Sequence, residues 1–228
     1  MKPGILAIWN DVDSGGFAHL EKWYTREHIF ERVGLPGFLS GRRYELISGG
    51  DTRFFTFYEA SDPSAFTSPA YLERLNDPTP WTTEAMSHFR SMVRTVCEVH
   101  ASAGVVSGPY AVVLRADGDI NPPPAATPFV ESLAAQDGVV RAQLWTAASG
   151  FTRSDTAEAK LRRGDKLIAG GLVVECVRLD DAERIAEGLT PDTVAGLGIS
   201  GPVVLGTYGL LCILDKRALS GGQHHAKS

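Results

Sequence analysis

The sequence predicts an α+β protein built from two consecutive β-α-β-β-α-β units of the ferredoxin-like type. Two observations lead to this prediction. Segments with strand periodicity and segments with helical spacing alternate in the same order twice along the chain. The halves also share a short pattern, GFLSGRRY at residues 37–44 and GVVRAQLW at residues 138–145, in which a glycine and an aromatic residue are seven positions apart.

The first unit is expected to contain four strands and two helical regions. In chain order these are strand 4–12, helix 16–33, strands 38–47 and 53–60, helical region 63–89 and strand 93–99. Ser14 is a candidate N-cap of the first helix, and Pro36-Gly37 ends that helix. The sequence Ser-Gly-Gly-Asp at 48–51 is typical of a turn between paired strands.

The second unit repeats this order less clearly. Its expected elements are strand 110–115, helix 128–136, strands 139–147 and 167–179, helix 182–189 and strand 203–214. A charged insertion at residues 149–165 contains a short helical piece. We therefore predict two domains, at residues 1–105 and 106–219, followed by a disordered tail at residues 220–228 that contains His224 and His225.

The composition is that of a soluble globular protein. The chain has 228 residues, of which 43% are hydrophobic and 21% charged, and its net charge of -5 argues against a general nucleic-acid binder. The cysteines Cys97, Cys176 and Cys212 are far apart and form no Cys-x-x-Cys pair, so a reduced cytoplasmic location is expected. Neither a signal peptide nor a membrane-spanning segment is indicated.

The predicted topology also predicts where a ligand would bind. A ferredoxin-like unit places both helices on one face of its sheet and leaves the other face apolar and uncovered. We expect the two units to pack these faces together, which would create a barrel-like pocket between the sheets for a small-molecule substrate.

One stretch, residues 21–46, is chemically richer than the rest. It carries the patterns W-Y-x-x-E-H, L-P-G-F and R-R-Y, formed by Trp23, Tyr24, Glu27, His28, Leu35, Pro36, Gly37, Phe38, Arg42, Arg43 and Tyr44. These patterns resemble the dimeric α/β-barrel superfamily, specifically its EthD-like and muconolactone-isomerase-like branches. The resemblance implies a fused pseudo-dimer. It also implies a choice among cofactor-free isomerases, dehydratases, decarboxylases and monooxygenases, and haem-dependent enzymes.

His28 and Tyr44 are the predicted catalytic residues. The ordinary pKa of histidine, ~6.5, suits proton transfer near neutral pH. In the resembled isomerases, a histidine at the equivalent point of the first helix is implicated in proton transfer. Tyr44 would donate a hydrogen bond to a developing oxyanion. The alternative is that both side chains only pack in the interior.

Further residues are predicted to bind substrate. They are Asn10, Asp11, Trp23, Arg42, Tyr58, Trp81, Arg94 and His100. Most lie at a strand end or on the expected pocket face, whereas Trp23 belongs to the first helix and Trp81 is expected over the pocket mouth. Arg42 shares a strand face with Tyr44 and could hold a substrate carboxylate. Structural roles for Asp11 and Arg42 are the competing interpretation.

The function predicted first is a cofactor-independent lyase or isomerase that transfers a proton on a small aromatic-derived or keto/carboxylic metabolite. The alternatives are a haem-dependent enzyme or haem-binding protein using His100 or His28, a cofactor-free monooxygenase, and a non-catalytic ligand-binding accessory protein. No spacing typical of a metal site occurs. Self-association into a homodimer of the fused pseudo-dimer is left open. A single active site would belong mainly to the first half, because Tyr44 corresponds to Trp145 and His28 has no counterpart.

Overall fold

A closed antiparallel barrel of eight strands forms the centre of the molecule. The computed structural model describes residues 2–152, 155–162 and 164–221. The barrel strands follow the order β1-β3-β2-β10-β5-β8-β7-β4. Their bounds are β1 Gly4–Val12, β2 Phe38–Gly49, β3 Phe54–Ala60, β4 Phe89–Ala103, β5 Tyr110–Ala116, β7 Val139–Ala147, β8 Gly170–Cys176 and β10 Val203–Asp215.

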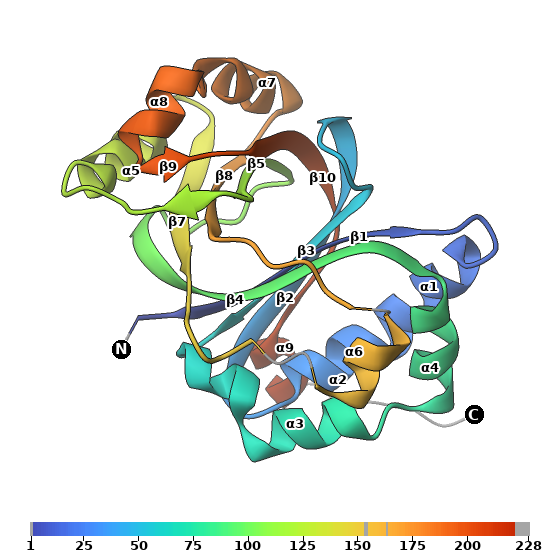
Figure 1. Cartoon of the computed structure of the whole chain (residues 1–228). Coiled ribbons are helices and arrows are strands. Elements are labelled where there is room, and N and C mark those ends of the chain that lie inside the picture. The colour runs from blue at the N-terminus through green and yellow to red at the C-terminus, as the bar shows by residue number, and fades with distance from the viewer. Residues whose placement is uncertain (1, 153–154, 163, 222–228) are drawn as a thin grey trace.

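Helices cover the barrel in two groups on opposite sides (Figure 1). The first group is α1 Phe17–Trp23, η1 Tyr24–His28, α2 Ile29–Val33, η2 Pro63–Thr67, α3 Pro69–Asn76, α4 Pro80–Ser87 and α6 Ala157–Leu161. The second group is α5 Ala126–Ala134, α7 Leu179–Gly188 and α8 Pro191–Gly196. Thus α6, which comes from the insertion in the second half of the sequence, lies with the helices of the first half (Figure 1).

The predicted fold class is confirmed, but the two sheets meet differently from our expectation. Each half has the ferredoxin-like strand order, β4-β1-β3-β2 and β7-β8-β5-β10. The halves do not stack as open layers with a pocket between them. They join edge to edge through β2–β10 and β4–β7, where Tyr44 pairs with Leu210 and Trp145 with Val99. Closure satisfies backbone groups that would otherwise be exposed at the sheet edges.

Side chains fill the inside of the barrel. The buried cluster there consists of Ile5, Ala7, Trp9, Tyr44, Phe55, Phe57, Val93, Cys97, Val99, Ala111, Val113, Trp145, Ile168, Val173 and Tyr208. Barrels of this size are just wide enough for side chains to fill them. The expected pocket between the two sheets is therefore a packed core in this protein.

The internal repeat predicted from the sequence has a structural basis. Gly37 and Gly138 both have positive φ, 83° and 77°, directly before β2 and β7. Glycine adopts this left-handed conformation without the steric cost of a Cβ atom. The matching aromatic residues, Tyr44 and Trp145, both project into the barrel core.

Several local details differ from the sequence predictions. Helix α1 has Gly16 as its N-cap without a side-chain hydrogen bond, so Ser14 does not cap it. Two short strands, β6 Asp119–Ile120 and β9 Ile199–Ser200, pair with each other and were not predicted. Helix α9, Lys216–Gly221, extends into the predicted tail. The rest of that tail, including His224 and His225, lies outside the described residues.

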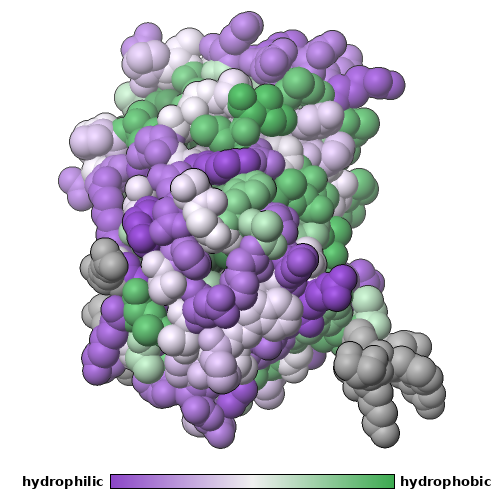
Figure 2. Space-filling view, turned by 90° about the vertical axis from the view of Figure 1, so that its right-hand side faces the viewer, coloured by the Kyte–Doolittle hydropathy of each residue, from purple (hydrophilic) through white to green (hydrophobic). Residues whose placement is uncertain are grey.

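Apolar side chains also reach the surface. Figure 2 shows apolar surface alternating with polar surface on one face of the molecule. Ile47 of β2 and Leu211 and Ile213 of β10 are among the exposed large apolar residues of the chain. Scattered apolar exposure of this kind is common on folded proteins.

Candidate active site

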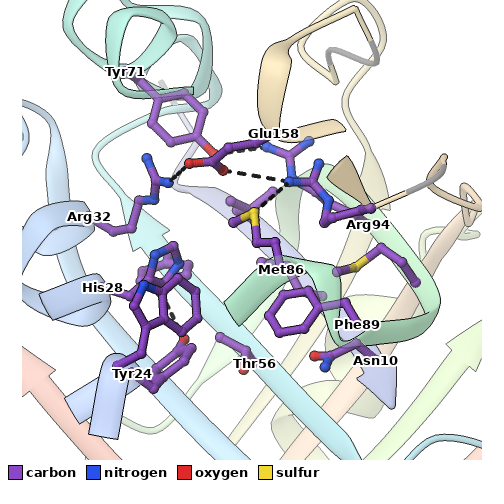
Figure 3. Close-up of a pocket in the computed structure, with 16 residues that line it drawn as sticks. Asn10, Tyr24, His28, Arg32, Thr56, Tyr71, Met86, Phe89, Arg94 and Glu158 are labelled. Atoms are coloured by element: carbon purple, nitrogen blue, oxygen red, sulfur yellow. Dashed lines mark hydrogen bonds and ion pairs between the residues drawn. The ribbon is translucent and has the colours of Figure 1, made fainter. Parts of the chain in front are cut away.

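A cavity lies outside the barrel, between the sheet of the first half and the helices that cover it (Figure 3). The space between its lining atoms, counted out to the mouth, is about 470 Å³. The lining residues are Leu6, Ile8, Asn10, Trp23, Tyr24, His28, Arg32, Thr56, Tyr58, Tyr71, Met86, Phe89, Met92, Arg94, Glu158 and Arg162.

Strand alternation decides which side chains reach this cavity. Successive residues of a strand point to opposite faces of the sheet. On β1, Leu6 and Ile8 face the cavity, whereas Ala7 between them packs inside the barrel. On β3, Thr56 faces the cavity and Phe57 the barrel core. The cavity therefore occupies the helix-covered face of the sheet, opposite the face that the sequence analysis favoured.

A π-helical turn positions the histidine. The backbone N–H of Ile29 donates to the carbonyl of Tyr24, five residues earlier. This wider turn aligns side chains five positions apart, and the rings of Trp23 and His28 stack with centroids 4.1 Å apart. Trp23 Nε1 donates to Thr82 Oγ1 at 3.1 Å, which fixes the indole. Single π turns within α-helices are frequent at functional sites.

His28 is a buried imidazole whose Nδ1 has no hydrogen-bond partner in the described part of the chain. The nearest charged acceptor, Glu31 Oε2, is 4.0 Å away, which is too far for a hydrogen bond. Burial, followed by the positive charges of Arg32, Arg162 and Arg43, holds the pKa of His28 well below its usual value. The ring is therefore neutral near pH 7 and can accept a proton.

Two tyrosines form a hydroxyl pair beside the histidine. Tyr24 Oη and Tyr58 Oη are 2.7 Å apart, and either can be the donor. Burial raises the pKa of Tyr24 to about 12 and that of Tyr58 well above its ordinary value of 10.0. Both hydroxyls keep their protons at neutral pH. One proton joins the two oxygens, and the second hydroxyl hydrogen can be donated to another acceptor.

The opposite end of the cavity is rich in guanidinium groups (Figure 3). Arg32 Nη2 forms an ion pair with Glu158 of α6. Glu158 also lies 3.5 Å from Arg162, and Arg162 is paired with Asp165 at 2.8 Å. Arg94 Nη2 donates to the hydroxyl of Tyr71 at 2.8 Å. The insertion that carries α6 thus completes a cavity of the first half.

The structure brings together only some of the catalytic and substrate-binding residues that were predicted from the sequence. His28, Asn10, Trp23, Tyr58 and Arg94 line the cavity. Arg94 does so from the helix-covered face of β4, a different face of the sheet from the one we expected.

Tyr44 and Arg42 belong to a different environment, inside the barrel. Tyr44 Oη donates to Glu175 at 3.1 Å, and Arg42 Nη1 lies 3.3 Å from Glu59 and 3.7 Å from Glu175. Arg141 pairs with the same two carboxylates. Two guanidiniums therefore balance two carboxylates. The sheet separates this network from His28, so Tyr44 and His28 do not meet in one pocket as expected.

The other three predicted residues do not line the cavity. Asp11 Oδ1 accepts from the backbone N–H of Arg53 at 2.7 Å. Trp81 packs edge-on against His19, with ring centroids 6.0 Å apart. His100 is half-buried on β4. These placements favour structural roles over contact with a ligand in this cavity.

Sequence reasoning did not assign six polar lining residues to the site, namely Tyr24, Arg32, Thr56, Tyr71, Glu158 and Arg162. Arg32 follows His28 by four positions, and helical spacing could have placed both on one face. Glu158 is 126 residues from Arg32, in an insertion without any recognisable motif. Nothing in the sequence predicts that contact.

Two negative findings apply to residues 2–152, 155–162 and 164–221. Among them, no group of three or more His, Cys, Asp or Glu side chains could hold a metal ion. No helix formed by these residues is both long enough and apolar enough to cross a bilayer.

No family model and no curated protein sequence matches this chain. Solved structures do match it over nearly its whole length. An anthrone oxidase-like protein aligns with a TM-score of 0.64 at 12% identity, covering 100% of this chain and 97% of that one. A candidate monooxygenase from Fusobacterium nucleatum aligns with a TM-score of 0.56 at 13% identity, covering 94% and 95%.

A candidate chlorite dismutase, TA0507, aligns with a TM-score of 0.54 at 11% identity and covers 97% of this chain and 98% of that chain. At these identities the comparisons establish the fold alone. The chain has the dimeric α+β-barrel fold with both ferredoxin-like units in one polypeptide. The resemblance stated from the W-Y-x-x-E-H, L-P-G-F and R-R-Y patterns is thereby confirmed at the level of the fold.

Proposed function

We propose that this protein is an oxidase of an enolisable polycyclic aromatic substrate, with His28 as the base that removes a proton from carbon. The observation that supports this most strongly is the environment of His28. A neutral imidazole, whose Nδ1 has no hydrogen-bond partner among the described residues, lies in a cavity lined by aromatic side chains. A buried base of this kind is suited to accept a proton from a substrate held against it.

The aromatic wall would hold the substrate ring. Trp23, Tyr24, Tyr58 and Phe89 line the cavity together with Met86. Flat aromatic surfaces bind polycyclic ligands through stacking and edge contacts. A methylene carbon flanked by aromatic rings and placed at Nδ1 of His28 would lose its proton to the imidazole.

The tyrosine pair would stabilise the charge that this proton transfer creates. Loss of a proton from a methylene that is conjugated with a carbonyl group through the aromatic rings places negative charge on the carbonyl oxygen. The Tyr24–Tyr58 pair has one hydroxyl hydrogen that can be donated to such an oxygen. Preorganised donors of this type commonly contribute ~10²–10³ to a rate.

Dioxygen would complete the reaction. The enolate carbon transfers electrons to dioxygen and becomes bonded to it as a peroxide. The peroxide then loses water and leaves a ketone, so a methylene and one dioxygen yield one carbonyl and one water. The substrate itself supplies the electrons. The apolar walls would protect the carbanion from reprotonation by solvent.

The comparisons favour this reaction over the lyase or isomerase that was predicted first. The structural neighbours include an anthrone oxidase-like protein and a candidate monooxygenase. A lyase or isomerase would share the initial proton abstraction and differ by not consuming dioxygen. An accessory protein would bind the ligand and release it unchanged.

Haem is the cofactor that a chlorite-dismutase-like neighbour suggests. Of the two histidines proposed as axial ligands, His100 does not line the cavity and His28 does. Trp23 also covers one face of the His28 ring. These features do not favour axial ligation of haem by either histidine, and we derive no step through haem.

Oxygen consumption with anthrone as the test substrate would test the proposal. The purified protein is expected to consume one dioxygen for each anthraquinone formed, and His28→Gln is expected to lower kcat by ~10²–10⁴. The same substitution at His100 provides a matched control and should leave kcat unchanged. Turnover that is equal in wild type and His28→Gln would refute the role of His28. A Soret band that tracks activity would support the haem alternative instead.

A further inference from the structure

Arg94 is a buried guanidinium that forms no ion pair with any carboxylate of the described residues. Its exposed fraction is 4%, and its one side-chain hydrogen bond goes from Nη2 to the uncharged hydroxyl of Tyr71 at 2.8 Å. Its Nη1 is buried and has no partner within the same residues. A guanidinium carries its positive charge throughout the physiological pH range. The cavity thus contains a cation without a counter-charge.

The carboxylates near this end of the cavity are already shared by other guanidiniums. Glu158 pairs with both Arg32 and Arg162. Glu31 lies 3.3 Å from Arg74 and 3.8 Å from Arg32. A buried, uncompensated charge is strongly unfavourable, and it is usually paired in the functional state. Since no carboxylate of the described residues pairs with Arg94, a ligand could supply the missing negative charge.

We propose that the substrate bound here is a polycyclic aromatic carboxylate, and that Arg94 binds its carboxylate group. Arg32 would contribute a second donor, because its Nη1 is also buried and unpaired in the described chain. Tyr71 links the two arginines. Its hydroxyl accepts from Arg94, and its ring centroid lies 5.7 Å from Cζ of Arg32. This inference rests on the proposed function for the reaction and specifies the substrate class of the same site.

The arrangement also orients the substrate. Figure 3 shows Arg94, Arg32 and Tyr71 at one end of the cavity, with His28 and Phe89 on opposite sides below them. A carboxylate at the arginine end would place the attached rings between His28 and Phe89. The charge of Arg32 is one cause of the lowered His28 pKa. An anionic substrate would offset this charge and make His28 a stronger base only when the site is occupied.

Calorimetric titration with naphthoate and with its methyl ester tests this proposal without requiring turnover. The two probes share the aromatic rings, and only the acid carries a charge. We expect the wild-type protein to bind naphthoate at least about tenfold more tightly than the ester. Arg94→Gln should abolish this preference and leave the affinity for the ester unchanged. Arg94→Lys keeps the charge and should retain part of the preference.

Arg74→Gln is the matched control. Arg74 pairs with Glu31 but does not line the cavity, so this variant loses the same positive charge outside the binding site. It should preserve the preference for naphthoate. Equal affinity of the wild-type protein for the two probes, or no binding of either, would overturn the proposal. His28→Gln should still bind naphthoate more tightly than its ester, so a failure of the proposed reaction remains distinguishable from a failure of acid recognition.

Thermal unfolding provides a second readout that does not depend on a ligand. If Arg94 serves only the fold, Arg94→Met should lower Tm. If it is held for an anionic ligand, removal of the uncompensated charge should raise Tm of the ligand-free protein. Naphthoate should then raise Tm of the wild type but not of Arg94→Met. A lower Tm for Arg94→Met together with an unchanged preference in Arg94→Gln would assign Arg94 a structural role.

Discussion

At the scale of single residues, burial decides how His28 responds to pH. The imidazole is more easily protonated in the unfolded chain, where its pKa is ~6.5, than in the cavity, where its pKa is well below that value. Between these two values the unfolded state binds more protons. The free energy of unfolding therefore falls as pH decreases below about 6.5, and the decline ends below the folded-state pKa.

We expect His28 to lower the free energy of unfolding by up to about 1.4 kcal/mol for each unit by which the pH falls, measured by urea unfolding between pH 7 and pH 5. His28→Gln should flatten the slope over this interval because it removes the group that titrates. The same substitution at half-buried His100 controls for a general effect of losing a histidine. Identical slopes for wild type and His28→Gln would show that the imidazole does not resist protonation in the folded state.

The roles of two tyrosines can be separated by matched substitutions. Tyr58 belongs to the hydroxyl pair in the cavity, whereas Tyr44 donates to Glu175 inside the barrel. Tyr58→Phe should lower kcat by ~10²–10³ with little change in Tm. Tyr44→Phe should leave kcat unchanged and cost ~1.5–3 kcal/mol of stability, because the hydrogen bond goes to a charged group. Steady-state kinetics and urea unfolding of both variants measure these effects. A larger loss of kcat in Tyr44→Phe than in Tyr58→Phe would contradict the assignment.

Sequence reasoning identified several important residues but assigned some of them to the wrong side of the sheet. The first-half pattern singled out His28, which lines the cavity, and strand alternation placed Arg42 and Tyr44 on one face of β2. The error came from placing the ligand between the sheets, where Tyr44 and Arg42 project. In the folded chain, aromatic side chains fill that space. Which face of a sheet is filled and which is hollow depends on the sizes of residues distant in sequence.

At the scale of secondary-structure elements, the π turn of residues 24–28 is the decisive feature. The sequence predicts a helix over residues 16–33 and gives no sign of the wider turn, because a π turn is a single extra residue within an otherwise regular pattern. That extra residue permits Trp23 and His28 to stack. The turn lies beside the cavity and contributes Tyr24 and His28 to its lining.

Deletion of Thr25 is expected to restore regular α-helical hydrogen bonding. Thr25 is exposed and its side chain bonds only within the helix, so α1 and α2 should keep their packing. His28 would rotate relative to Trp23, and activity should fall about as far as in His28→Gln. Circular dichroism and Tm should show a folded protein. Thr25→Ala, which keeps chain length, should remain active. An active deletion variant would show that the π turn has no functional importance.

At the scale of the whole molecule, the two halves depend on each other in two places. The insertion from the second half delivers Glu158 to the cavity of the first. Inside the barrel, Glu59 and Glu175 occupy equivalent positions on β3 and β8 and share Arg42 and Arg141. The sequence predicted the duplicated topology, whereas neither of these connections between the halves is visible in a local pattern.

Glu175→Gln should therefore destabilise the whole barrel. The substitution leaves two buried guanidiniums with one carboxylate, and the expected loss is about 3–5 kcal/mol in the free energy of unfolding. Glu98→Gln, which removes the exposed pair with Lys2, should cost only about 0–1 kcal/mol. Urea unfolding at constant pH measures both. A loss for Glu175→Gln as small as that for Glu98→Gln would mean that the barrel network contributes little to stability.

Hydrogen exchange at the methylene carbon of anthrone, followed by NMR in deuterated water without oxygen, tests the proposed chemistry most directly. Proton abstraction should still occur when dioxygen is absent. The wild-type protein is therefore expected to accelerate deuterium incorporation well above the uncatalysed rate, and His28→Gln should not. Oxygen-dependent turnover without any accelerated exchange, or equal acceleration by wild type and His28→Gln, would contradict proton abstraction by His28.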